Sequence, residues 1–140
     1  MWDLSPELEE SRPLFKRGVC VWDYGSQAVT QTYKDLDDDS QVCFSHRLRL
    51  ALCCERLEAL RDTINLKVGG GVSELKCPKA RGYYMVVTFK GRVSLCLLRV
   101  GAKSKEQKND IARAKELAKD VEEWLKSQED QENDEADEDK

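Results

Sequence analysis

The residues best suited to chemistry are one cysteine and the single histidine of this 140-residue chain. Cys43 and His46 lie three positions apart, so a helix would place them on one face, where an imidazole can deprotonate a thiol. A Cys-His nucleophile also needs a third group that orients the base and a backbone turn that binds an oxyanion. The surrounding sequence offers neither. We therefore expect no catalytic residue and a non-enzymatic protein.

An acidic run at positions 35–39, DLDDD, begins like a calcium-binding loop. Such a loop needs a glycine at its sixth position and a bidentate glutamate at its twelfth, where this chain has Ser40 and His46. The run is therefore expected to be a solvated loop that caps the next helix. Zinc is not expected either, because the chain has no C-x-x-C pair and Cys53 and Cys54 would point to different sides of a helix. The sequence predicts no metal and no cofactor.

Charge is distributed unevenly along the chain. The formal net charge is −4, but residues 129–140 hold eight acids and one lysine, whereas residues 67–119 carry 13 Lys or Arg and four acids. Basic side chains near strand ends could follow a phosphate backbone, and the acidic segment could compete for the same surface. The candidates for a nucleic-acid site are Lys76, Lys79, Arg81, Lys90, Arg92, Arg99, Lys103 and Lys105.

The elements that must position these residues form one predicted domain over residues 14–127. A short helix is expected near Ser5, in the N-terminal segment 1–13, and disorder is expected in the acidic segment 128–140. Residues 18–33 look like two strands joined by a turn at D-Y-G-S. The apolar spacing over residues 41–64 predicts a long amphipathic helix.

The second half of the chain is predicted to contain strands and a final helix. Strands are expected at 66–68 and 72–77 around a Gly69–Gly71 turn, and at 83–89 and 92–100 around a two-residue turn that places Phe89 opposite Arg92. Both faces of this last hairpin are apolar, so it should be covered on both sides. The fold class is therefore α+β: an antiparallel sheet of about five strands with helices on its faces, in the order α-β-β-α-β-β-β-α. The last helix, at 105–126, has an apolar stripe made of Ile111, Ala114, Ala118, Val121 and Leu125.

Two stretches resemble the roadblock and longin group of profilin-like domains. VCVWDYGSQAV is similar to the first hairpin of that group, and YYMVVTFKGRVSLCLLRVG, followed by a helix, is similar to its closing hairpin and last helix. The resemblance covers about residues 14–127. It implies a non-enzymatic subunit that pairs through its sheet edge or a helix and serves as a platform in trafficking, motor or small-GTPase complexes. It assigns no role to any individual residue.

The expected function is that of an adaptor that binds other proteins or a second copy of itself. The alternative is a module that binds nucleic acid, RNA in particular, through the basic segment 67–119. Six cysteines in mainly apolar stretches, and no apolar run long enough to span a membrane, indicate the cytosol or the nucleus. The predicted partner contacts are the tip of the first hairpin, an exposed edge at 72–77 and the surface of the last hairpin, represented by Trp22, Tyr24, Val72, Leu75, Tyr83 and Tyr84.

Overall fold

The fold is that of a computed structural model, which describes residues 12–22, 29–89, 91–103 and 107–138. Four predictions lie outside these residues: the helix near Ser5, the turn that contains Tyr24, and the phosphate contacts of Lys90 and Lys105.

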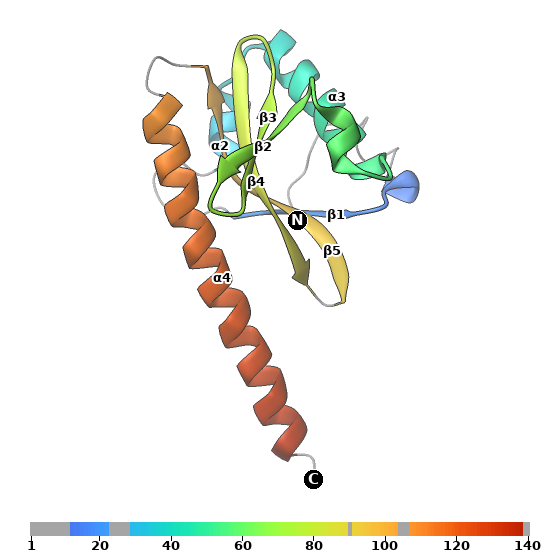
Figure 1. Ribbon diagram of the computed structural model, residues 1–140, viewed down its shortest axis with the longest axis vertical. Coiled ribbons are helices and arrows are strands. Elements are labelled where there is room, and N and C mark those ends of the chain that lie inside the picture. Colours follow the sequence, from blue (N-terminus) through green and yellow to red (C-terminus); the bar gives the residue numbers. More distant parts are fainter. Residues whose placement is uncertain (1–11, 23–28, 90, 104–106, 139–140) are drawn as a thin grey trace.

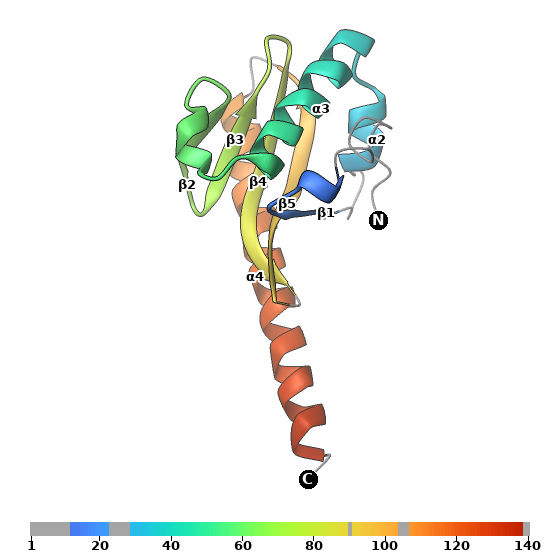
Figure 2. The same cartoon turned by 90° about the vertical axis from the view of Figure 1, so that its right-hand side faces the viewer.

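A five-stranded sheet forms the middle layer of the described protein (Figure 1). Its strands lie in the order β1-β5-β4-β3-β2, and neighbours are antiparallel except β1 and β5, which run parallel. β1 and β2 are therefore the two edge strands, and Figure 2 shows β2 at its edge. The strands are β1 Gly18–Val21, β2 Ile64–Gly69, β3 Val72–Lys76, β4 Ala80–Phe89 and β5 Arg92–Ala102.

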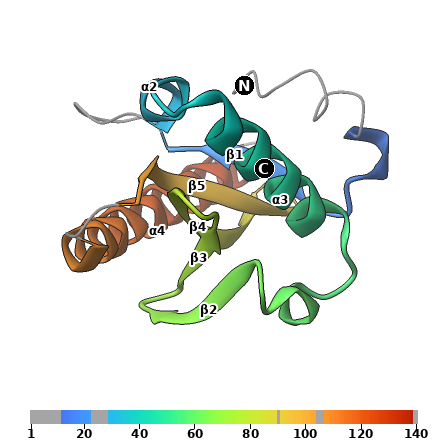
Figure 3. The ribbon, with the colours of Figure 1, turned by 90° about the horizontal axis from the view of Figure 1, so that it is seen from above.

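Helices cover both faces of this sheet, as Figure 3 shows from above. α2 and α3 pack on one face and α4 packs on the other. This architecture confirms the predicted α+β class, with a mainly antiparallel sheet and helices on its faces. The helices are α2 Val29–Lys34, α3 Asp38–Cys53 and α4 Gln107–Glu138, with short 3-10 helices η1 at Arg12–Leu14 and η2 at Leu57–Leu60.

The two faces of the β4–β5 hairpin belong to separate cores. The register places Phe89 opposite Arg92, as the two-residue turn predicts. Leu97 belongs to the core beneath α2 and α3, whereas Met85 and its partner Cys96 belong to the core beneath α4. The expectation that this hairpin is covered on both faces is confirmed away from its turn but is wrong near the turn, where Val86 and Val93 are 46% and 45% exposed. The predicted stripe of α4 packs into the second core through Ile111, Ala114, Ala118, Val121 and Leu125.

The second strand predicted within residues 18–33 is wrong, because residues 29–34 form the helix α2. Val29 and Tyr33, which alternate like strand residues, lie four positions apart and are both buried on the sheet side of α2. The Tyr33 hydroxyl also lies 2.7 Å from Ser45 Oγ of α3. One strand therefore precedes α3 and four follow it, instead of the two and three that the resemblance implies.

The central helix ends at Cys53, about ten residues earlier than predicted. The guanidinium of Arg17 donates to the carbonyls of Ala51 and Cys54 at 3.1 and 2.6 Å, and so satisfies groups that a helix end leaves without intrahelical partners. The apolar period continues beyond this point because the following residues also face the core. Ile64, for example, faces the core and is 3% exposed, but it belongs to the strand β2 and not to a helix.

The last helix is longer than predicted, since α4 continues to Glu138. Most of the segment expected to be disordered, 128–140, is thus drawn as helix. A helix that is already nucleated by packed turns is extended one residue at a time at little cost, which is the physical reason for the difference. The end of α4 projects beyond the sheet (Figure 1).

Candidate functional site

The predicted partner contacts of the sheet are in its interior. β3 lies between β2 and β4, so the prediction of an exposed edge at 72–77 is wrong. Val72, Leu75, Tyr83 and Tyr84 are at most 2% exposed. These four side chains stabilise the two cores and offer no surface to a partner.

The edge on this side of the sheet is β2 instead. The Lys76 N–H donates to the Thr63 carbonyl at 2.8 Å, and Asn65 pairs with Glu74. Because hydrogen-bonded and non-bonded positions alternate along antiparallel strands, the backbone groups of Ile64, between Thr63 and Asn65, point away from β3. This position of the edge strand β2 therefore presents an outward-facing N–H and C=O, which is what an added strand requires.

A groove of about 390 Å³ lies beside this edge. Its apolar part comes from Leu57 of η2 and from Ile64 and Leu66 of β2. Leu66 is 40% exposed, which is unusual for a leucine in a sheet whose other side is packed. The groove is lined by Leu57, Glu58, Arg61, Ile64, Asn65 and Leu66.

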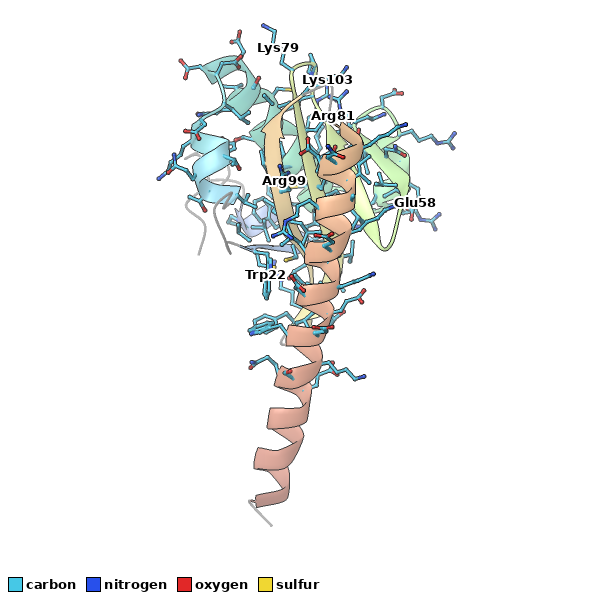
Figure 4. All side chains as sticks on the ribbon, turned by 90° about the vertical axis from the view of Figure 1, so that its left-hand side faces the viewer. Trp22, Glu58, Lys79, Arg81, Arg99 and Lys103 are labelled. Carbon is cyan, nitrogen blue, oxygen red and sulfur yellow. The ribbon has the colours of Figure 1, made fainter. Side chains whose placement is uncertain are left out.

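A second hollow of about 500 Å³ shares Leu57 and Glu58 with the first. It extends the concave surface toward Arg17 and toward Val86 of β4, which is 46% exposed. This hollow also mixes aliphatic side chains with charged ones, and it borders the groove on the side away from β2. Figure 4 shows Glu58 at this edge, on the side of α4 opposite to Trp22.

Three basic residues, Arg17, Arg56 and Arg61, and two acidic ones, Glu55 and Glu58, line the groove and the adjoining hollow. Arg56 and Arg61 are exposed, and among the described residues neither forms an ion pair. Glu58 is the one acid that lines the groove. An acidic side chain on a bound segment would therefore be favoured next to the two arginines.

Sequence reasoning missed this site because it assigned Leu57 and Ile64 to one long helix. The signal that could have located it is the alternation from Ile64 to Val68, in which apolar residues are separated by Asn65 and Lys67. A lysine in the middle of a half-polar strand is typical of an edge strand, because it discourages uncontrolled pairing.

The predicted phosphate contacts do not form one surface among the described residues. Lys76, Arg81 and Arg99 are engaged internally: Lys76 Nζ donates to the Arg61 carbonyl at 3.3 Å, Arg81 pairs with Glu74 at 3.2 Å and Arg99 pairs with Asp110 at 2.9 Å. Lys79 and Lys103 lie together at one end of the sheet (Figure 4), and the Lys103 N–H donates to the Lys79 carbonyl at 2.9 Å. Arg92 is at the far end of the 11-residue strand β5.

The acidic end of α4 is also far from this pair of lysines. The helix starts near Lys103 and runs for 32 residues, or about 48 Å, so its acidic end projects past the opposite end of the sheet (Figures 1 and 4). Competition between the acidic segment and nucleic acid within one molecule, as the sequence suggested, has no support in this arrangement.

The residues considered for catalysis have separate partners. Arg47 Nε donates to Cys43 Sγ at 3.3 Å, and His46 Nδ1 lies 3.3 Å from Arg49 Nη2. No hydrogen bond joins Cys43 to His46 in the described part of the chain. The arrangement of a thiolate and its base is therefore not formed.

The acidic run caps a helix through Asp37, whereas Asp39 and Ser40, the caps that the sequence favours, lie inside the helix. Asp37 Oδ1 accepts from the Ser40 N–H at 2.7 Å, so Asp37 is the N-cap of α3, and Asp38 and Asp39 lie in the first helical turn. Hydrogen bonds from Ser40 hold the pKa of Asp37 below its ordinary value. The described residues contain no group of three His, Cys, Asp or Glu side chains placed to hold a metal ion.

Comparisons with known proteins give no match: no family model, no curated protein and no solved structure is similar to this chain. Within the described residues, no helix combines the length and the apolar character needed to cross a membrane.

Proposed function

We propose that this protein is a non-enzymatic adaptor that binds an extended segment of another protein along β2. The observation that carries the proposal is the outward-facing backbone of Ile64 on the edge strand β2, beside a groove of about 390 Å³. The roadblock and longin resemblance points to the same class of function. That resemblance implies pairing through a sheet edge. The edge proposed here is β2, and not the segment 72–77 that the sequence indicated.

The backbone would supply part of the affinity. Ile64 offers one N–H and one C=O, so an added strand can form two hydrogen bonds with it, each worth about 0.5–1.5 kcal/mol. The bulge between Asn65 and Gly69 ends the regular part of the strand. It limits pairing to a short segment and so makes binding depend on side chains as well.

Side chains in the groove would supply the selectivity. An aliphatic side chain of the partner fits between Leu57, Ile64 and Leu66, and its burial contributes about 1.5–3 kcal/mol. Acidic residues beside it would lie near Arg56 and Arg61. The expected ligand is therefore an extended peptide with an aliphatic residue flanked by Asp or Glu.

The test is to select binders from a displayed library of random peptides and to measure their affinity for three proteins. Leu66→Pro changes an edge-strand residue at the bulge, where proline is tolerated, so the sheet should stay intact while the groove loses a lining side chain and a backbone N–H. Val93→Asp is the matched control, because Val93 is 45% exposed and lies near the β4–β5 turn. Circular dichroism checks that both variants fold.

We expect the selected peptides to lose at least tenfold in affinity with Leu66→Pro, which corresponds to about 1.4 kcal/mol, and to bind Val93→Asp like the wild type. Amide hydrogen exchange should slow at residues 64–66 when peptide is bound. Equal binding to wild type and Leu66→Pro, or protection located elsewhere, would contradict the proposal. A dimer in sizing experiments that Leu66→Pro abolishes would identify a second copy as the strand donor.

A further inference from the structure

Two cysteines face each other across the parallel pair of strands. Cys20 of β1 is the direct register partner of Cys96 of β5. Neighbouring strands lie about 4.8 Å apart, which is within the range of Cα separations that a disulfide spans. The two thiols are close enough for each to shift the pKa of the other. This pair takes no part in the proposed binding edge.

Both thiols line a cavity of about 210 Å³ between β1, the β4–β5 hairpin and α4. Cys20 is partly exposed, and Cys96 is 3% exposed. A small reagent that enters this cavity would therefore meet Cys20 first. Cavity access distinguishes the pair from Cys43 and Cys77, which also contact each other but line none of the cavities described above.

Aromatic side chains form the mouth of the cavity. The Trp124 ring lies 5.9 Å from that of Trp22 and 5.6 Å from that of Phe89, measured between centroids. Trp22 is partly buried against α4 (Figure 4), and its predicted role as a partner contact stays a prediction. Its place two residues from Cys20 makes it a fluorescent reporter of chemistry at that thiol.

The two thiols differ in acidity. The hydrogen bond with Cys96 lowers the pKa of the Cys20 thiol, against the opposing effect of burial. The same hydrogen bond and burial raise the pKa of Cys96. Cys20 is therefore the thiol that forms a thiolate and attacks, while Cys96 is placed to resolve the product.

We propose that Cys20 and Cys96 form a reversible dithiol–disulfide site that exchanges with small disulfides such as glutathione disulfide. The Cys20 thiolate attacks one sulfur of the small disulfide, whose S–S bond breaks and releases one thiolate. Cys96 then gives its proton to solvent and attacks the Cys20 sulfur, which releases the second thiolate. The two cysteines lose two electrons to the small disulfide, which is reduced to two thiols once both thiolates are protonated.

The resulting bond would be easy to reduce. Side chains of directly paired residues run side by side, whereas the Cβ atoms of a disulfide approach to about 3.8 Å, so β1 must move toward β5. β1 is an edge strand of four residues, which permits this movement at some cost in strain. Strained disulfides are oxidising and labile, a property of regulatory bonds in reducing compartments.

The test is to equilibrate the reduced full-length protein in glutathione buffers of increasing oxidised fraction and to map disulfides by mass spectrometry. Trypsin separates the two cysteines, because Cys20 lies in the peptide 18–34 and Cys96 in 93–99. We expect a linked pair of these peptides, and a change in tryptophan fluorescence that dithiothreitol reverses. Cys96→Ala should instead accumulate a glutathione adduct at Cys20, and Cys53→Ser, a partly exposed thiol at the end of α3, should behave like the wild type.

A complementary measurement on the wild type does not depend on whether the variants fold. Brief alkylation by iodoacetamide should modify Cys20 at least tenfold faster than Cys96. Linkage of Cys43 to Cys77 alone, absence of the 20–96 linkage at every glutathione ratio, or equal alkylation of the two thiols would each overturn the proposal. None of these readouts depends on peptide binding at β2, so the two proposals can fail separately.

Discussion

Gly82 of β4 lies against the ring of Phe44 from α3, and this contact gives a sharp test of how the first core is packed. A Cβ built on Gly82 would lie 2.3 Å from Phe44 Cε2 and 3.0 Å from Phe44 Cζ. Carbon atoms that are not bonded prefer separations of about 3.5–4.0 Å. Gly82→Ala therefore forces the fully buried Phe44 ring to shift by about 1 Å or more.

The shift cannot be absorbed locally. The Phe44 ring also packs against Tyr33 of α2, with ring centroids 5.9 Å apart, so moving it disturbs both helices. Overpacking of this kind costs about 1–3 kcal/mol, and the entropy that alanine removes from the unfolded chain returns only about 0.4–1 kcal/mol. We expect Gly82→Ala to lower the free energy of unfolding by about 2 kcal/mol, seen as a urea midpoint about 1 M lower.

A control variant and a second-site variant test whether Phe44 packs on Gly82. Gly101→Ala, in β5, adds a Cβ with no heavy atom within 4 Å and should change stability by less than about 0.5 kcal/mol. Phe44→Leu shortens the side chain that would clash with the new methyl group of Gly82→Ala. The free energy of unfolding of the double variant should therefore exceed the value expected from adding the two single effects by at least about 1 kcal/mol. If the two effects simply add, or if Gly82→Ala costs no more than Gly101→Ala, Phe44 does not pack on Gly82 as described.

Three further outcomes follow from buried polar groups and from the end of α4. Arg81→Met leaves the buried Glu74 carboxylate without its ion pair and should cost about 3 kcal/mol in urea unfolding, whereas Lys16→Met, at an exposed pair, should cost less than about 0.5 kcal/mol. Burial raises the pKa of Tyr84 to about 12 from 10, so its contribution to stability is complete below pH 10 and is lost as the pH rises toward 12. Urea midpoints should therefore fall more for the wild type than for Tyr84→Phe between about pH 9 and pH 11. Deleting residues 130–140, where α4 projects beyond the sheet, should change the free energy of unfolding by less than about 0.5 kcal/mol.

The parts of the fold that the sequence predicts well are those whose pattern has one interpretation. Phe89 opposite Arg92 follows from a two-residue turn between long apolar strands, and the α4 stripe follows from a sustained helical period. The errors arose where one pattern fits two structures. Val29 and Tyr33 satisfy both a strand period and a helical spacing of four, and only contact with Ser45 of α3 favours the helix.

The candidate site shows a different limit of sequence reasoning. Burial of Val72 and Leu75 reflects the position of β3 between two other strands, and strand order depends on contacts between distant parts of the chain. The end of α3 depends likewise on Arg17, which is 34 residues from Ala51. Without that long-range cap, the apolar positions that follow extend the helical period through the residues of the groove. Local patterns cannot distinguish these cases.

The two proposed sites occupy opposite edges of one sheet, and this separation has a functional consequence. β1 and β2 are four strand spacings apart, or about 19 Å, and the intervening strands are packed on both faces. Formation of the Cys20–Cys96 disulfide moves only β1 against β5, whereas a bound peptide contacts β2 and η2. Oxidation is therefore expected to leave peptide affinity at β2 unchanged and to alter the surface formed by Trp22 and Trp124 at the other edge. Peptide affinity measured on the reduced and on the oxidised protein checks this independence, and a loss of affinity on oxidation would contradict it.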